Sequence, residues 1–64
     1  MNHDRAFLFQ VEIIQGTTTL RESRMVLASS LAVATILLNS TLAVVYGAGT
    51  ARAKIIGDAR EVGL

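Results

Sequence analysis

MVLASSLAVATILLNSTLAVVY, residues 25–46, is a run of 22 residues that contains no charged residue, proline or glycine. A helix of this length rises by about 33 Å at 1.5 Å per residue, which is close to the hydrocarbon thickness of a bilayer. The run therefore predicts a long apolar helix that is buried in a membrane or in an assembly. We expect the rest of the chain to flank this helix.

The composition leaves little room for a self-contained core. The chain has 64 residues, of which 52% are hydrophobic and only 5% aromatic. It has no cysteine and a single histidine, so neither a disulfide nor an obvious metal site is available to stabilise it. We expect lipid, copies of the chain or a larger partner to bury the apolar run. The net charge of +1 gives no long-range attraction to nucleic acid or anionic lipid.

The boundaries of the long helix follow from its flanking residues. Thr19-Leu20-Arg21-Glu22 has the form of a capping box, in which the Thr hydroxyl and the Glu carboxylate satisfy each other's backbone N–H groups. We therefore expect the helix to occupy about residues 20–47. Gly47 and Gly49 would end it and form a turn.

Both flanks of the long helix are amphipathic. Residues 4–15 have one apolar helical face and predict a short helix, and residues 51–62 predict another. Residues 7–14 also alternate as a half-buried strand would, but a lone strand has no pairing partner unless neighbouring copies supply one. We therefore prefer the helix. The predicted fold class is all-α, a single helical unit over residues 1–64 that is self-assembling or membrane-embedded, with helices over 4–15, 20–47 and 51–62.

One face of the expected long helix carries mostly small or polar side chains. At 100° per residue they fall close to Asn39. Small residues allow close helix approach, and a buried amide needs a partner, so the stripe predicts a helix-packing seam with Asn39 as its polar pin. The alternative is an accidental stripe in a helix rich in Ala, Ser and Thr. This small-residue stripe consists of Ala28, Ala32, Thr35, Asn39, Ala43 and Tyr46.

Basic residues lie at both ends of the expected helix. Arg21 and Arg24 lie in its first turns, before the apolar run, and Arg52 and Lys54 follow the helix. These residues would contact a lumen, lipid headgroups or DNA, or extend to the membrane interface as ordinary snorkelling side chains. The acidic residues are scattered along the flanks, and no nucleophile–base pair or ligand cluster stands out. We expect no enzymatic activity, no catalytic or metal-binding residue, and no cofactor apart from bound lipid.

Two resemblances support a membrane helix. Residues 19–45 resemble one transmembrane stretch of an uncharacterised family of multi-pass proteins from plants and prokaryotes. The resemblance lies in the segment Thr19-Leu20-Arg21-Glu22-Ser23-Arg24-Met25, which leads into a span rich in Ala, Ser and Thr. The overall layout, with its small size, long helix, Gly47/Gly49 turn and basic Arg52 and Lys54, is similar to that of small pilins of conjugation and DNA-transfer pili of the type IV secretion kind, including archaeal DNA-import versions. The second resemblance implies an all-helical chain that waits in the membrane and then stacks into a tube, often with lipid. Bacterial pilins usually carry two strongly apolar helices, whereas the first and third segments here are only amphipathic.

These observations predict a structural, non-enzymatic subunit that self-associates through its apolar helix into a helical filament, most concretely a pilin of a conjugation or DNA-transfer pilus. The alternative is a single-pass accessory subunit of a larger membrane complex. A filamentous-phage coat protein fits less well, because acidic residues offset its basic end. The expected partners are copies of the chain, lipid or membrane, and other membrane-complex subunits, with DNA only as transported cargo. The expected location is the membrane before assembly and a cell-surface filament afterwards.

Overall fold

An antiparallel hairpin forms the first half of the chain. The computed structural model describes residues 4–47 and 49–63. Strand β1 (Arg5–Gln15) pairs with strand β2 (Thr18–Ala28) in an unbroken register, from Arg5 opposite Ala28 to Gln15 opposite Thr18. The loop between them has two residues, and its first, Gly16, has φ +61°, as a type II′ hairpin turn requires.

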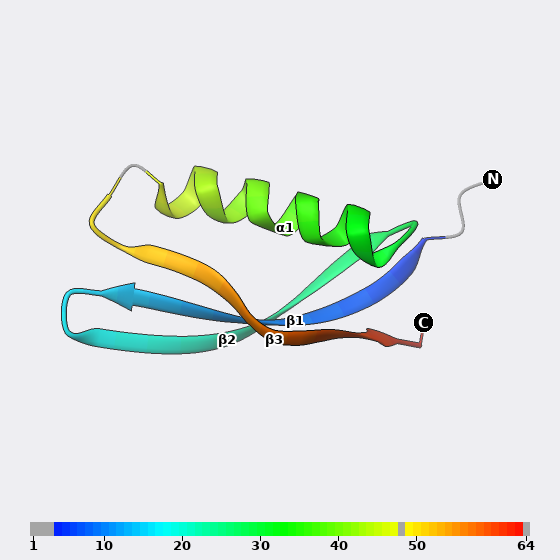
Figure 1. Ribbon diagram of the computed structural model, residues 1–64, viewed down its shortest axis with the longest axis horizontal. Coiled ribbons are helices and arrows are strands. Elements are labelled where there is room, and N and C mark those ends of the chain that lie inside the picture. The colour runs from blue at the N-terminus through cyan, green and yellow to red at the C-terminus, as the bar shows by residue number, and fades with distance from the viewer. Residues whose placement is uncertain (1–3, 48, 64) are drawn as a thin grey trace.

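Helix α1 (Leu31–Tyr46) follows the hairpin and lies along one face of the sheet (Figure 1). Ser30 caps its N-terminus, because the Ser30 hydroxyl accepts a hydrogen bond of 3.2 Å from the Val33 N–H. Ala34, Leu38 and Leu42, each four residues apart, are the buried residues of the helix. This spacing keeps the three side chains on the side of α1 that contacts the sheet.

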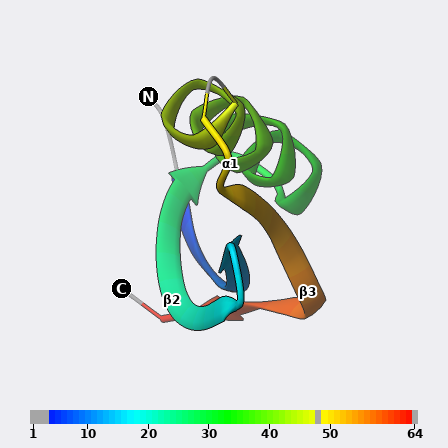
Figure 2. The ribbon, with the colours of Figure 1, turned by 90° about the vertical axis from the view of Figure 1, so that its left-hand side faces the viewer.

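Strand β3 (Arg52–Val62) returns along the other side of β1, so the order across the sheet is β2-β1-β3, with both pairings antiparallel. Its register shifts between the pairs Leu8/Arg60 and Gln10/Ile56, which leaves three residues of β3 opposite Phe9. Gly57, with φ +64°, lies in this bulge. Figure 2 shows the curved sheet beneath the helix, with β2 and β3 at its two edges.

The core lies between α1 and the central strand. Alternate residues of β1 face the helix, and each is at most 5% exposed. The buried cluster consists of Phe7, Phe9, Val11, Ile13, Ala28, Ala34, Leu38 and Leu42. Partly buried side chains of Val26, Tyr46, Ala53, Ile55 and Ala59 pack at its margin. The other side of the sheet, which we call the open face, carries no helix among the described residues.

The all-α prediction is wrong. More than half of the described residues lie in strands, and the segments 4–15 and 51–62, predicted as helices, form β1 and β3. Most of residues 20–30, predicted as the first turns of the long helix, belong to β2, so α1 begins at Leu31. The physical reason is pairing: β2 supplies the partner that a strand in residues 7–14 needs, and the hairpin buries the alternate apolar side chains of β1.

Among residues 4–47 and 49–63, no helix is both long and apolar enough to cross a membrane. The apolar run is divided between the end of β2, a short connection and the 16 residues of α1. The predictions of a transmembrane helix and of a pilin are therefore wrong. The predicted location, first in the membrane and then in a cell-surface filament, depended on the same helix and is wrong as well.

Candidate functional site

The side of α1 that faces away from the sheet is apolar and uncovered. Ile36 is 65% exposed and Val44 is 82% exposed, and no residue of α1 carries a charge. A helix on a protein surface normally presents charged and polar side chains to water. Contiguous exposed apolar residues instead mark sites of interaction. We call this side the outer face of α1, and it consists of Val33, Ile36, Leu37, Ser40 and Val44.

A shallow depression of about 290 Å³ lies at one edge of the outer face. It is lined by Ser40 and Val44 of that face and by Thr41 and Val45 beside it. Ile36 precedes Ser40 by one turn on the same side of the helix. The Thr41 hydroxyl donates a hydrogen bond of 3.0 Å to the Leu37 carbonyl, so its polar group is already satisfied within the helix. An apolar partner can therefore cover the Thr41 hydroxyl at little cost in lost hydration.

The structure spreads the predicted small-residue stripe over different environments. Ala28 lies in β2 and is buried, whereas Ala32, Asn39 and Ala43 are exposed on α1. Thr35 and Tyr46 are partly buried, and the Thr35 hydroxyl donates to the Leu31 carbonyl at 2.9 Å. The helical members of the stripe therefore run along the flank of α1, between the buried residues and the outer face.

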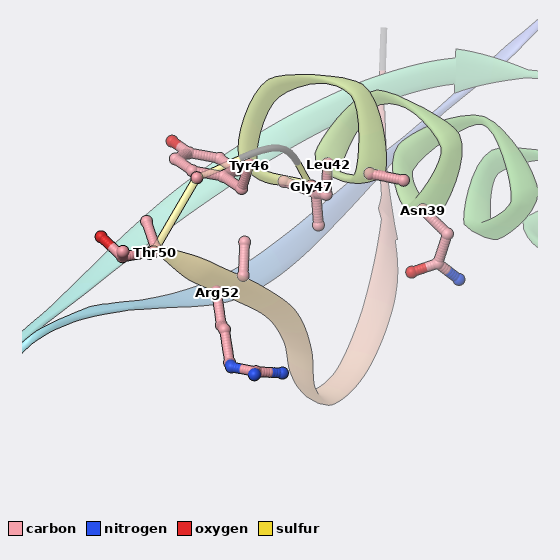
Figure 3. A pocket seen from close by; sticks show the side chains of 10 residues that line it. Asn39, Leu42, Tyr46, Gly47, Thr50 and Arg52 are labelled. Carbon is pink, nitrogen blue, oxygen red and sulfur yellow. The ribbon is translucent and has the colours of Figure 1, made fainter.

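A groove of about 650 Å³ separates the C-terminal half of α1 from the start of β3 (Figure 3). Asn39 and Tyr46 reach it from the helix, and Arg52 reaches it from β3. The side chains offer an amide, a phenol, a hydroxyl and a guanidinium, with no carboxylate or imidazole among the lining residues. The groove brings together six residues that the sequence singled out: Asn39, Ala43, Tyr46, Gly47, Gly49 and Arg52.

The four predicted basic contact residues do not form one site. Arg21 and Lys54 lie on either side of Glu12 on the open face, with nitrogen–oxygen distances of 3.3 Å and 3.8 Å. Arg24 pairs at 2.7 Å with Glu22 on the same strand. Three of the four cations are therefore engaged by carboxylates of the sheet, while the fourth, Arg52, lines the groove.

An ion pair that the sequence did not predict joins the start of β1 to the end of β3. Arg5 donates two hydrogen bonds to Glu61, at 2.9 Å from Nε and 2.6 Å from Nη2, and its guanidinium lies 5.2 Å from the centre of the Phe7 ring. These hydrogen bonds lower the pKa of Glu61 below its ordinary value and raise the pKa of Arg5. The pair fastens β1 to the end of β3.

No protein-family model, curated protein or solved structure matches this chain. In the part of the chain that the structure describes, no group of three or more His, Cys, Asp or Glu residues could hold a metal ion, and the single histidine, His3, lies outside those residues. The candidate functional site is therefore the outer face of α1. Its signal in the sequence is the absence of charge over residues 31–46, a pattern that predicts burial in a membrane or in an assembly.

Proposed function

We propose that the chain is a structural, non-enzymatic subunit of a homo-oligomer, in which the outer face of α1 packs against the outer face of a second copy. The observation that supports this proposal best is the exposure of large apolar side chains on a helix without charges, with Ile36 at 65% and Val44 at 82%. The sheet covers one side of this helix. A second helix of the same kind would cover the other.

The chemistry of the outer face favours an identical partner. In a two-fold symmetric contact both copies use the same surface, so each contact between two different residues occurs twice. A face with charges of one sign would repel itself in this arrangement, whereas the outer face has none. If the axis passes near Ser40 and the helices run antiparallel, Ile36 of one copy lies at the level of Val44 of the other. The face is then complementary to itself in polarity.

The hydrophobic free energy of this contact is comparable to the cost of association. Complete burial of a Val, Leu or Ile side chain contributes about 1.5–3 kcal/mol. Four such side chains of the outer face are roughly half exposed, so pairing two copies contributes on the order of 6–12 kcal/mol. Association costs on the order of 4–15 kcal/mol. We therefore expect the helix contact by itself to form a dimer that dissociates on dilution.

Sedimentation equilibrium over a range of concentrations tests the proposal. The wild-type chain is expected to have a mass of at least two copies, and Ile36→Glu is expected to halve that mass, because the contact would bury its carboxylate. Asn39→Glu is the matched control, since it adds the same charge to the same helix on the groove side. Circular dichroism checks that both variants fold. An unchanged mass for Ile36→Glu would contradict the proposal.

A further inference from the structure

We propose that strand β2 is a second self-association site, at which β2 of one copy pairs antiparallel with β2 of another about a two-fold axis at Ser23. The pairing would join two three-stranded sheets into one sheet of six strands. This inference rests on the proposed function only in taking the partner to be a second copy. The residues that carry it lie on β2 and are separate from the outer face of α1.

Strand β2 is an edge of the sheet with a regular backbone. It pairs with β1 on one side, and Figure 2 shows it at the margin of the sheet. Its register with β1 continues over all eleven residues without a shift. The opposite edge, β3, is interrupted by the bulge that contains Gly57, and bulges are one of the features that protect edge strands from further pairing. An incoming strand therefore fits β2 better than β3.

The backbone groups on the outer side of β2 follow from the hairpin. Gln15 and Thr18 flank a two-residue loop and form the hydrogen-bonded pair that closes it. Along an antiparallel ladder the direction of the backbone N–H and C=O groups alternates with each residue. The residues of β2 that direct these groups away from β1 are therefore Thr19, Arg21, Ser23, Met25 and Leu27. A two-fold axis at Ser23 would place these residues of one copy opposite the same set of residues in the other, so their outward N–H and C=O groups could form hydrogen bonds.

The length of β2 and its charges select the same register. Ser23 is the midpoint of the strand, so an axis there pairs all eleven residues, with Thr18 of one copy opposite Ala28 of the other. It also places Glu22 of each copy opposite Arg24 of the other. A shift of the axis by one residue would bring Glu22 against Glu22 or Arg24 against Arg24, and like charges directly opposite are destabilising.

The charged centre of β2 therefore discriminates between partners. Glu22 and Arg24 lie 2.7 Å apart in a single copy, on the side of the strand that faces α1. Charges at an edge discourage pairing with most strands. A second copy in the Ser23 register supplies the opposite charge at both positions, so the same residues that exclude other strands accept this one.

The two contacts together define an assembly. An axis perpendicular to the joined sheet leaves both α1 helices on one face, with their outer faces directed away from the strands. Two such sheet pairs can then meet through their helices, which gives four copies with the outer faces at the centre. Each copy in this arrangement uses β2 once and α1 once.

Exchanging the charges between two variants tests the β2 contact. Glu22→Arg places cations opposite cations, and Arg24→Glu places anions opposite anions, so each variant is expected to sediment at half of the four-copy mass of the wild type. In an equimolar mixture the introduced arginine faces the introduced glutamate, and the four-copy mass is expected to return. Variants that keep the wild-type mass, or a mixture that stays at half of it, would overturn the β2 contact.

Combining the charge variants with Ile36→Glu separates the two proposals. Ile36→Glu by itself should leave β2-paired dimers, and Ile36→Glu with Glu22→Arg should give monomers. If only the charge variants change the mass, the β2 contact stands and the helix contact is wrong; if only Ile36→Glu does, the reverse holds. A monomeric wild-type chain would overturn both. Ser23→Pro is a second probe of β2, because it removes an outward N–H, and it is expected to halve the mass as well. Ser23→Ala is its control, since both variants lose the hydrogen bonds between the Ser23 and Gln10 side chains.

Discussion

Arg5 at the start of β1 donates two hydrogen bonds to Glu61 near the end of β3, across 56 residues of sequence. The guanidinium also covers the ring of Phe7, which belongs to the buried cluster. The pair therefore joins the first and last strands at the edge of the core. Both side chains remain about half exposed, so the strength of the pair depends on pH and on salt concentration.

The first prediction concerns acid stability. Because the pKa of Glu61 is lower in the folded chain than its ordinary value of 4.5, the folded state favours the charged carboxylate, and the stabilisation is present above pH 4.5. It is lost as the pH falls through the lower, folded-state pKa. We expect Glu61→Gln to melt at a lower temperature than the wild type at pH 7 and to lose less stability on acidification. Thermal melts from pH 7 to pH 3, with Asp58→Asn as the control, measure this. Equal acid sensitivity of wild type and Glu61→Gln would contradict it.

The second prediction concerns the bulge in β3. Gly57 has φ +64°, and a Cβ atom added there meets nothing within 4 Å, so a substitution is opposed by the backbone conformation alone. We expect Gly57→Ala to destabilise the fold by about 1–2 kcal/mol. Gly57→Asn should cost less, because asparagine tolerates this conformation better. Urea unfolding measures both, and Gly63→Ala is the control because its backbone is not in the left-handed region. Equal stability of Gly57→Ala and wild type would show that the bulge does not need glycine.

The third prediction concerns the core. Phe9 is 1% exposed and is one of the two largest fully buried side chains. Phe9→Ala is expected to cost about 3–5 kcal/mol, which is as much as the core of so small a domain supplies. We therefore expect the variant to be largely unfolded at 25 °C by circular dichroism, whereas Leu8→Ala, a half-buried neighbour, should stay folded. A cooperative melt of Phe9→Ala close to that of the wild type would contradict the assigned core.

The strand β1 was visible in the sequence, and its partner was not. The alternation of apolar and other residues over 7–14 is typical of a strand, but a lone strand needs a neighbour, so the sequence by itself favours a helix. That neighbour begins at Thr18, in a segment whose Thr19–Glu22 motif has the form of a capping box. Glu22 instead lies opposite Val11 in the sheet. A four-residue motif could not outweigh eleven cross-strand pairs, and those pairs depend on the turn at Gly16.

The candidate site was partly visible for a similar reason. The uncharged run includes the helix whose outer face is exposed, but the sequence alone does not show that the sheet buries the other side of this helix. The sheet buries one side of α1, which carries Ala34, Leu38 and Leu42. Which side of the helix is buried depends on how the helix packs on the sheet, and the helix sequence alone does not determine it. The alternation of β3 is weak in the sequence for another reason, because Ile55 and Ile56 are adjacent apolar residues and Gly57 follows them.

Disulfide formation from a single cysteine at the centre of the outer face tests the central claim most directly. The chain has no cysteine, so Ser40→Cys introduces its only thiol. Two helices that pack through their outer faces about an axis near Ser40 bring the two Cys residues within bonding distance, whereas Thr17→Cys at the hairpin loop is a control far from the contact. Under mild oxidation we predict that Ser40→Cys forms a covalent dimer in high yield at concentrations where Thr17→Cys does not. Equal, low yields for both variants, at concentrations where the chain sediments as an oligomer, would contradict the account.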